Sequence, residues 1–227
     1  MNEVDKLKYI SLVEFLGKAL GSHTEVVLHD IDEESNSILA ISNGHISNRK
    51  IGAPITDLAL KFIVDKEYEK RDYVCNYTGK SKGDKIIKSS TFFLKDDDGK
   101  LIGLLCINQD KSKYLEISKE ILDLAKIFDT EKEIKTLNNK LDPLNITTHK
   151  ENFADSVSEM TYDILHEFVD LTNIPPERMT QDEKLIIIDK LNQKGVFMLK
   201  GAVTEVAKQL HSSEASIYRY LGKISKK

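Results

Sequence analysis

Residues 201–227, GAVTEVAKQLHSSEASIYRYLGKISKK, contain the pattern that decides the fold of the C-terminal part of this chain. Apolar residues at 3.6-residue spacing predict one helix from about Val203 to Leu210 and a second helix after Ser213, a favourable N-cap residue. Ala207 is small where the two helices approach each other, and Ile217 follows ten residues later, where the second helix faces the first. This spacing is typical of a helix-turn-helix, whose second helix lies in the major groove of DNA.

The turn between these helices departs from the usual pattern. The chain takes a left-handed conformation at this point, which favours Gly, but the residue here is His211. A non-Gly residue loses roughly 1–2 kcal/mol in that conformation, and Asn, Asp and His tolerate it best. The next position is usually apolar and is Ser212 here. Two amphipathic helices of an ordinary bundle are the alternative interpretation of this stretch.

Outward positions of the second helix are candidates for DNA contact. Arg219 can pair with guanine through two hydrogen bonds, whereas Ser213, Ser216 and Tyr218 can reach base edges or phosphates. Glu214 can accept a hydrogen bond from cytosine, although its position near a helix N-terminus is the explanation that we favour. Lysines suit contacts to phosphates, which position a protein without specifying sequence. Those lysines are Lys208, Lys223, Lys226 and Lys227.

Composition and length bound the class of protein. The chain has 227 residues, of which 40% are hydrophobic and 31% are charged, which suffices for one large domain or two small ones. No apolar run approaches the roughly 18 residues of a membrane span, and the first residues lack the apolar stretch of a signal peptide. Two cysteines, Cys75 and Cys106, are too few for a disulfide scaffold, so we expect a reducing cytoplasm and small apolar roles for both.

Charge is distributed unevenly along the chain. From Pro175 to Lys227 there are ten Lys/Arg and six Asp/Glu, a net of about +4. Because the whole chain has a net charge of −4, the remaining residues have a net of about −8. A basic C-terminal part on an acidic body is what a DNA-binding domain attached to a sensor would show.

The N-terminal half reads as helix, two strands, helix and three strands, which predicts an α+β, PAS-like sensor domain over residues 1–113. Its five strands would form an antiparallel sheet, and the last two are nearly continuous apolar runs, as expected of central strands that are covered on both faces. The expected helices are Asp5–Leu20 and one that Pro54 opens, and the expected strands are Thr24–His29, Ser37–Ile41, Val74–Tyr77, Ile86–Leu94 and Leu101–Asn108.

Residues 114–150 are expected to form a connecting helix and linker. Ile127, Ile134 and Leu141 repeat every seven residues, which fits a short coiled coil between two copies or a single helix on the sheet. Residues 151–227 would then form the DNA-binding domain. In this domain Thr180-Gln-Asp-Glu183 is a capping box that opens a helix, and Val196–Leu199 reads as a short extended segment.

Polar residues inside the apolar strands are candidates for contact with a small ligand, because a buried polar group needs a hydrogen-bond partner. They are Asn76, Ser89, Ser90, Thr91 and Asn108, together with His45, which follows the Asn43-Gly44 turn. Each of them can instead pair with neighbouring backbone or face solvent.

The sequence also resembles a known family. The stretches EVVLHD, ISNGHISNRKIGAPITDLAL, NYTGKS and KSSTFFLKDDDGKLIGLLCINQD in the N-terminal half carry this resemblance, as do PPERMTQDEKLIIIDKLNQKGVFMLKGAVTEVAKQL and IYRYL. Together they are similar to the YheO-like transcriptional regulators, which join a PAS-type domain to a helix-turn-helix domain and include the D-arginine utilisation repressor. The resemblance is weakest over Lys111 to Ser158. It implies a regulator of transcription.

From these observations we expect a cytoplasmic homodimer that binds a double-stranded DNA operator and senses a small-molecule effector. No cofactor and no metal site are expected, since the sequence has no CxxC or HxxxH pair. Two alternatives from other classes stay open. One is a PAS-like module that only dimerises or binds another protein. The other is an enzyme in which His29 and Asp30 act in acid–base catalysis.

Overall fold

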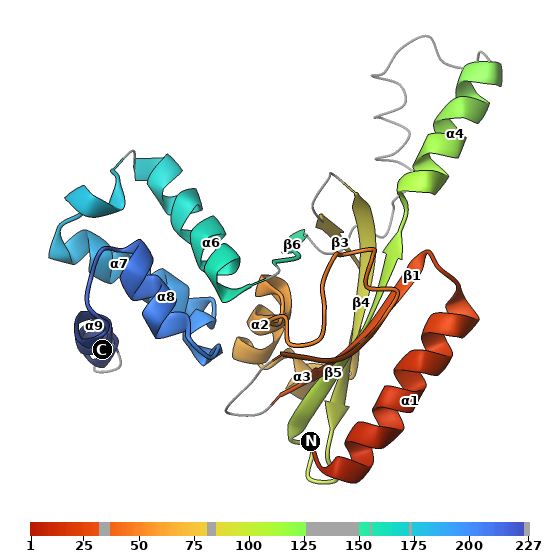
Figure 1. The fold of residues 1–227 in the computed structure, drawn as a ribbon, viewed down its shortest axis with the longest axis horizontal. Helices are drawn as coiled ribbons and strands as arrows, with labels where there is room; N and C mark the ends of the chain where they lie inside the picture. The colour runs from red at the N-terminus through yellow and green to blue at the C-terminus, as the bar shows by residue number, and fades with distance from the viewer. Residues whose placement is uncertain (32–36, 81–84, 126–149, 155, 173, 225–227) are drawn as a thin grey trace.

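The computed structural model describes residues 1–31, 37–80, 85–125, 150–154, 156–172 and 174–224. Figure 1 shows a sheet flanked by helices on both faces, followed by a group of helices at the other end of the molecule. The predicted heptad residues Ile127, Ile134 and Leu141 lie outside the described residues. Among the described helices, none combines the length and the apolar character needed to cross a lipid bilayer.

The sheet has the strand order β2-β1-β5-β4-β3-β6. Its first five strands pair antiparallel, so the predicted α+β fold with a five-stranded antiparallel sheet is confirmed. The sixth strand comes from beyond the connecting region and pairs parallel to β3 at the edge of the sheet. The strands are β1 (Thr24–Asp30), β2 (Ser37–Ser42), β3 (Tyr73–Lys80), β4 (Ile86–Lys95), β5 (Leu101–Asp110) and β6 (Lys150–Asn152).

Burial along the strands matches the prediction for β5 but not for β4. In β5 the buried residues are nearly continuous, as in a strand that is covered on both faces, whereas β4 alternates between buried and exposed positions, with Phe92 47% exposed. The prediction for Cys75 was also wrong. A shift of register between Val74 and Tyr77 bulges β3, and Cys75 is exposed there, whereas Cys106 in β5 is buried.

Helix α1 (Glu3–Leu20) packs against the sheet face that presents Val26 and Leu28. Gly17 allows this close approach, because a Cβ at that position would lie 1.9 Å from the Ser42 hydroxyl oxygen. Asn43 then fixes the end of the helix to the sheet. Its side-chain amide donates to the backbone carbonyls of Gly17, Gly21 and Thr24 at 3.1, 3.1 and 2.7 Å.

The other face of the sheet is covered by α2 (Asp57–Val64) and α3 (Glu67–Lys70). Helix α2 begins three residues after Pro54, because the Thr56 side chain accepts a hydrogen bond from the backbone N–H of Ala59 and caps the helix. The Phe62 ring of α2 meets the rings of Tyr77 and Phe93 edge to face, with centroids 5.7 and 6.1 Å away.

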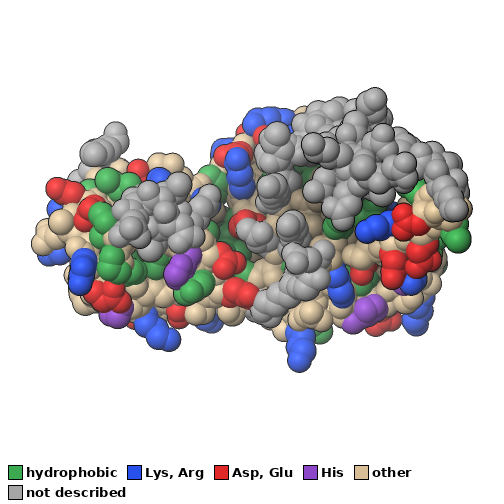
Figure 2. Space-filling view, turned by 90° about the horizontal axis from the view of Figure 1, so that it is seen from above, with side chains coloured by type: hydrophobic (Ala, Val, Ile, Leu, Met, Phe, Trp, Pro, Cys, Tyr) green, Lys and Arg blue, Asp and Glu red, His purple; other side chains and the backbone are tan. Residues whose placement is uncertain are grey.

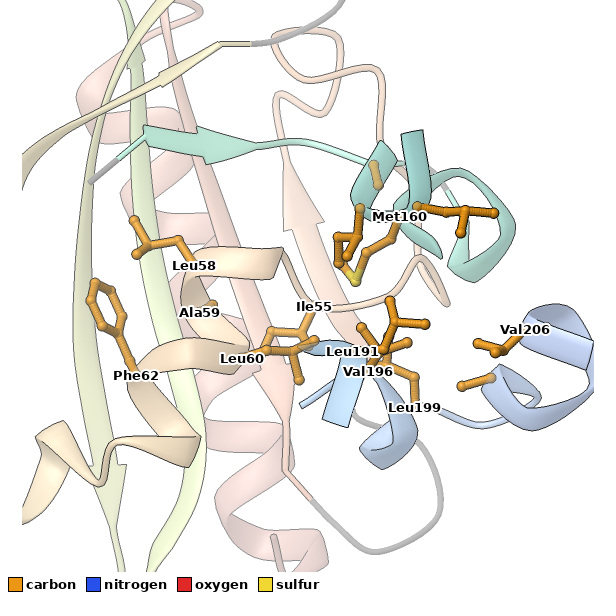
Figure 3. Close-up of a cluster of buried hydrophobic side chains, with 14 of the residues drawn as sticks. Ile55, Leu58, Ala59, Leu60, Phe62, Met160, Leu191, Val196, Leu199 and Val206 are labelled. Atoms are coloured by element: carbon orange, nitrogen blue, oxygen red, sulfur yellow. The ribbon is translucent and has the colours of Figure 1, made fainter. Parts of the chain in front are cut away.

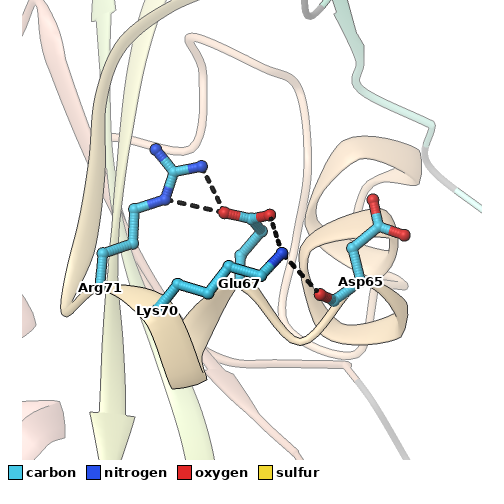
Figure 4. Close-up of polar contacts among 4 residues, drawn as sticks. All are labelled: Asp65, Glu67, Lys70 and Arg71. Carbon is cyan, nitrogen blue, oxygen red and sulfur yellow. Dashed lines mark hydrogen bonds and ion pairs between the residues drawn. The ribbon is translucent and has the colours of Figure 1, made fainter.

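A small ionic cluster fixes the path from α2 into β3 (Figure 4). One carboxylate oxygen of Glu67 binds the Lys70 ammonium at 2.9 Å, and the other accepts from the Arg71 guanidinium, whose Nε lies 2.8 Å away. Lys70 also reaches the backbone carbonyl of Asp65 at 3.4 Å. Lys70 first, and then Arg71, holds the pKa of Glu67 below its usual range.

The C-terminal part is helical. The Thr180–Glu183 capping box is confirmed, with the Glu183 carboxylate 2.7 Å from the Thr180 backbone nitrogen. The extended segment predicted at Val196–Leu199 was wrong. Val196–Met198 form a 3-10 turn, and of the predicted segment only Leu199 has an extended backbone; both Val196 and Leu199 are buried. The elements are α6 (Val157–Thr172), η1 (Pro176–Arg178), α7 (Gln181–Gln193), η2 (Val196–Met198), α8 (Ala202–Gln209) and α9 (Glu214–Ile224).

An apolar junction joins the sheet part to the helical part. Figure 3 shows Ile55 and Leu60, from the sheet part, beside Leu191 and Val196, and all four side chains belong to one buried cluster. Gly195 sits at the centre of the contact with a left-handed φ of 77°. A Cβ there would lie 2.8 Å from Val64 Cγ2, so only glycine allows α2 to pack this closely against the end of α7.

This junction gives a first prediction. Gly195→Ala should lower the free energy of unfolding by about 2–3 kcal/mol, because a side chain is disfavoured at this φ and the added methyl would meet Val64. Gly201→Ala is the matched control. Gly201 has a similar φ of 80° but nothing within 4 Å of an added Cβ, so its replacement should lose only about 1 kcal/mol. Denaturant unfolding of both variants measures the difference, and equal losses would contradict the close junction.

Candidate DNA-binding surface and sensor interior

The two helices of the predicted helix-turn-helix are α8 and α9, and they pack as the spacing predicts. Ala207 is 4% exposed and Ile217 is fully buried. Val206, Leu210 and Tyr220 complete the same buried cluster. A hydrogen bond of 2.7 Å from Ser158 of α6 to Glu205 of α8 attaches the pair to the rest of the domain.

The structure of the turn between α8 and α9 accounts for its two unusual residues, His211 and Ser212. His211 has the left-handed conformation that the sequence predicts, with φ 47°. The Ser212 backbone N–H donates to the Ala207 carbonyl at 2.8 Å, which closes the end of α8. Lys184 of α7 donates to the Leu210 carbonyl at 2.7 Å and to the Ser212 hydroxyl at 3.2 Å. A polar residue at position 212 therefore has a bonded partner where an apolar residue is usual.

Three of the polar candidates at the start of α9 have local partners. Ser213 caps the helix, since its hydroxyl accepts from the Ser216 backbone N–H at 3.2 Å and lies 3.0 Å from the Ser216 hydroxyl. Glu214 accepts a hydrogen bond of 2.7 Å from Thr204 of α8. The Thr204–Glu214 bond therefore links α8 to α9, whereas the Ser213–Ser216 contacts close the first turn of α9.

The exposed face of α9 presents Tyr218, 62% exposed, and Arg219, whose guanidinium carbon lies 5.6 Å from the centre of the Tyr220 ring. Sequence reasoning missed two exposed small residues on the same face, Ala215 and Gly222. Nothing lies within 4 Å of a Cβ at Gly222, so this face can approach another surface closely. Their spacing of seven residues, opposite the buried Ile217, was the signal that could have found them.

The predicted lysines are distributed around this surface. Lys208 on α8 and Lys223 on α9 are exposed, and Lys226 and Lys227 lie outside the described residues. Figure 2 shows basic and acidic side chains interspersed on the face that it presents. The excess of basic residues in the C-terminal sequence therefore does not form a continuous basic field on that face.

A second group of polar residues is buried inside the sheet domain. Glu25 of β1 is fully buried, and its carboxylate accepts hydrogen bonds from the Ser47 hydroxyl at 2.6 Å and from the Asn108 amide at 2.8 Å. Tyr77 and Thr91 pair through their hydroxyls at 2.7 Å, and Thr91 lies 3.3 Å from the Cys106 sulfur. We call this group the interior polar cluster. It consists of Glu25, Ser47, Arg49, Thr56, Tyr77, Ser89, Thr91, Cys106, Asn108 and Glu151.

Glu151 of β6 enters this cluster from the segment that connects the two parts of the molecule. It is 3% exposed, and its Oε1 accepts a hydrogen bond of 2.8 Å from the hydroxyl of Thr56, the residue that caps α2. Burial raises the pKa of Glu151 to about 7, although the hydroxyls of Thr56 and Ser89 act against the rise. Gly79 provides the space, since a Cβ there would lie 2.6 Å from the Phe153 ring and 3.3 Å from Glu151 Oε2.

Some oxygens of the cluster are buried without meeting hydrogen-bond geometry to another group in the described part of the chain. They are Asn108 Oδ1, together with the Ser89 hydroxyl and Glu151 Oε2, which act on each other. Buried polar atoms are nearly always hydrogen-bonded, so Asn108 Oδ1 can accept a hydrogen bond from a further group. Burial also raises the pKa of the Cys106 thiol to about 12 and that of the Tyr77 hydroxyl well above its usual value, so both keep their protons.

The residues predicted to contact a ligand do not all meet. Ser89, Thr91 and Asn108 lie together in the interior polar cluster. Ser90 is half-buried on the opposite face of β4, where its hydroxyl accepts from the backbone N–H of Asn76 at 3.2 Å. Asn76 is exposed in the β3 bulge, and His45 is exposed in its loop, where its carbonyl accepts from Lys85.

Three charged members of the cluster were missed by sequence reasoning, namely Glu25, Arg49 and Glu151. Glu25 could have been found, because it begins the apolar run Val26–Leu28 and no polar neighbour follows it before His29. Arg49 and Glu151 stand in polar loop sequence, which predicts exposure.

The residues of the enzyme alternative are not arranged as an open acid–base pair. His29 is 1% exposed, and burial, assisted by the charge of Arg49, holds its pKa well below the usual value. Asp30 is also buried, and its carboxylate forms an ion pair with the Lys6 ammonium, whose nitrogen lies 3.3 Å from Oδ2.

Together these features define the class of the protein. A PAS-type α+β domain precedes a helix-turn-helix domain whose second helix is exposed, which is the architecture of a DNA-binding transcriptional regulator. The chain belongs to the YheO-like PAS family: the model of the YheO-like PAS domain matches residues 3–126, and a helix-turn-helix domain model matches residues 160–222. The resemblance seen in the sequence is confirmed.

Relatives match over nearly the whole chain. The protein YheO of Escherichia coli strain K12 is 29% identical over 220 residues, which cover 96% of this chain and 85% of YheO. An uncharacterised protein of Haemophilus influenzae is 28% identical over 216 residues, with coverages of 95% and 89%. The transcriptional regulator DauR of Pseudomonas aeruginosa is 24% identical over 214 residues, with coverages of 94% and 91%.

The buried carboxyl of Glu151 predicts a pH dependence of stability. Its pKa of about 7 in the folded state lies above its usual 4.5, so the folded protein holds this proton more tightly than the unfolded chain. Stability should therefore fall as pH rises from about 4.5 to about 7, by up to about 3 kcal/mol from this group. Glu151→Gln, which stays neutral, should remove that part of the pH dependence.

Denaturant unfolding at several pH values measures this effect as the difference between wild type and variant. Glu183→Gln is the control. Thr180 holds the pKa of Glu183 below its usual range, so loss of that carboxyl should change the pH dependence in the opposite direction. Parallel pH profiles for wild type and Glu151→Gln would show that folding does not raise the pKa of Glu151.

Proposed function

We propose that this protein regulates transcription by placing α9 in the major groove of a double-stranded DNA operator, and that its PAS-type domain senses a small molecule. The observation that carries the DNA-binding part is the exposed face of α9, where Arg219 and Tyr218 project beside the small residues Ala215 and Gly222. The name of the relative DauR, a transcriptional regulator, supports the same function. The proposal includes a cytoplasmic location and a homodimer.

The sensing part of the proposal rests on the interior polar cluster. The buried Asn108 Oδ1 can accept a further hydrogen bond, and a small polar ligand carries donors of this kind. A ligand in this cluster would also lie near the domain-connecting segment, because Glu151 of the cluster belongs to β6.

Helix α2 offers a physical route from the cluster to the DNA-binding domain. Its N-terminus is bonded to Glu151 through Thr56, and its side chains Leu60 and Val64 face Gly195 at the end of α7. Leu199, in the same buried group, leads directly into α8. A change in the Thr56–Glu151 contact would therefore act on the helix that packs against the helix-turn-helix domain.

DNA recognition is tested by two substitutions on α9. If Arg219 pairs with a guanine, Arg219→Ala should weaken binding to the preferred site by about 1–3 kcal/mol and relax the preference at one base position. Lys223→Ala should instead weaken binding to all sequences similarly and reduce the salt slope by about one, as expected for a phosphate contact. Lys100→Ala, in the β4–β5 turn, is a control that should change neither.

Selection of bound DNA from a random pool supplies the preferred site, and competition binding at two salt concentrations measures all three variants. Equal losses of affinity for specific and random DNA in Arg219→Ala would show that Arg219 contacts only phosphate. Unchanged binding in both α9 variants would exclude this helix from the groove.

Ligand sensing is tested on the full chain with a library of small polar metabolites. A ligand of the cluster should raise the melting temperature of the wild type, because binding to the folded state stabilises it. Asn108→Leu should abolish that shift, whereas Asn76→Ala, at an exposed position of the same sheet, should retain it. Absence of any shift across the library, or a shift that survives in Asn108→Leu, would contradict sensing through this cluster.

A further inference from the structure

A cleft lies at the boundary between the sheet part and the helical part of the molecule. Its volume is about 370 Å³, which is within the range of small-molecule sites, and such sites often lie between domains. Figure 3 shows Leu199 on the helical side of this boundary and Ile55, the neighbour of Pro54, on the other side. The residues that line the cleft are Ser37, Gly52 and Pro54 from the sheet part and Ser156, Val157, Leu199 and Lys200 from the helical part.

Backbone hydrogen bonds hold both walls of the cleft. The Gly52 N–H donates to the Ile38 carbonyl at 2.9 Å, and the Ile38 N–H donates to the Ala53 carbonyl at 2.9 Å, so this loop is fixed against the start of β2. On the other side the Ala202 N–H donates to the Leu199 carbonyl at 3.1 Å. A ligand would therefore enter a preformed cleft and would not have to order its walls.

Three side chains of the cleft carry hydrogen-bond donors that have no acceptor in the described part of the chain. They are the hydroxyls of Ser37 and Ser156 and the ammonium group of Lys200. The Ser156 oxygen accepts from the Glu159 backbone N–H at 3.2 Å, so its hydrogen remains free to donate. Among the described residues no carboxylate lines the cleft. Three donors, one of them positively charged, fit the oxygens of an anion.

Further positive charge lies beside the cleft. A second hollow of about 450 Å³ shares Gly52 with the cleft and follows the loop of residues 48–53. It includes the exposed Lys50 and also Arg49, whose guanidinium donates to the carbonyl of Pro54 in the cleft wall. The ionisable side chains that line the two hollows, within the described ranges, are therefore all cationic, and a concave surface of one sign attracts ligands of the opposite charge.

We propose that this cleft binds a small organic anion, either a carboxylate or a phosphate ester. Its charged group meets Lys200 and the two serine hydroxyls, and its apolar part lies against Val157. Lys200 lies just before α8 and Val157 begins α6, whereas Ser37 begins β2, so the ligand contacts both domains and stabilises their arrangement. The cleft shares no lining residue with the interior polar cluster and is therefore a second, separate site.

Binding is measured on the full-length protein by ligand-observed NMR, with benzoate and phenyl phosphate as probes. At least one of these anions should bind to the wild type, and the one that binds more tightly identifies the charged group as carboxylate or phosphate. Benzyl alcohol has the ring without the charge, and inorganic phosphate has the charge without the ring. Each of these two should bind more weakly than the better anion, because each lacks one part of the expected contact.

Substitutions then locate the bound anion. Lys200→Met should weaken its binding roughly tenfold, because a charge-assisted hydrogen bond is lost, and should leave benzyl alcohol unaffected. Lys100→Met, in the exposed β4–β5 turn, is the matched control and should bind as the wild type does. Ser37→Leu, which fills the cleft from the opposite wall, should abolish binding. If Ser37→Leu does not fold, Lys200→Met decides alone, since Lys200 is exposed and its replacement leaves the packing unchanged.

Two results would overturn the cleft site: failure of both anions to bind the wild type, and equal affinity in the wild type and Lys200→Met. Asn108→Leu should bind the anion as the wild type does. A loss of binding in that variant would place the anion in the interior polar cluster and would overturn the cleft site too. Because these measurements contain no DNA, failure of α9 to recognise DNA would leave their outcome unchanged.

Discussion

The buried hydrogen bond between Glu151 and Thr56 ties the segment that connects the two domains to the start of α2. It joins residues that are 95 positions apart, and both are buried. One partner caps α2 and the other belongs to β6, so this bond joins a helix of the PAS-type domain to the domain connection. A buried carboxyl requires such partners even when it holds its proton, because a buried polar group without a hydrogen bond is unfavourable. Loss of the Thr56 hydroxyl would therefore affect more than the cap of one helix.

The apolar junction depends on the same helix. Leu60 and Val64 of α2 reach the end of α7 only because Gly195 has no side chain. Polar bonding at the start of α2 and close packing along it thus act on one short rigid element. Helix α2 has only eight residues, so a displacement of one end also moves the other end.

Local signals in the sequence predicted much of this fold. The helix-turn-helix was accessible because the periodicity of Val206, Leu210 and Ile217 and the cap at Ser213 involve neighbours along the chain. The left-handed His211 and the Thr180 capping box were accessible for the same reason. Strand β5 could be recognised as central because it is apolar over most of its length.

The polar interior could not be predicted in the same way. Asn108 and Glu25 are separated by 83 residues, and nothing near either of them in the chain indicates that they pair. Glu151 belongs to a three-residue strand whose partner is more than seventy positions earlier, so its local sequence resembles a linker. The 3-10 turn at Val196–Met198 was missed because a short apolar run fits a strand equally well, and only packing between α7 and α8 decides.

Strand β6 has one more consequence. It pairs along Thr78 to Lys80 and so covers the outer edge of β3, whose backbone groups would otherwise be available to another chain. The segment that connects the domains therefore also prevents the edge of the sheet from pairing with the edge of another sheet. Any movement that draws β6 away from β3 uncovers a row of unpaired backbone donors and acceptors. A piece of the protein cut before residue 150 would carry that open edge permanently, and its tendency to aggregate would reflect the cut rather than the stability of the PAS-type fold.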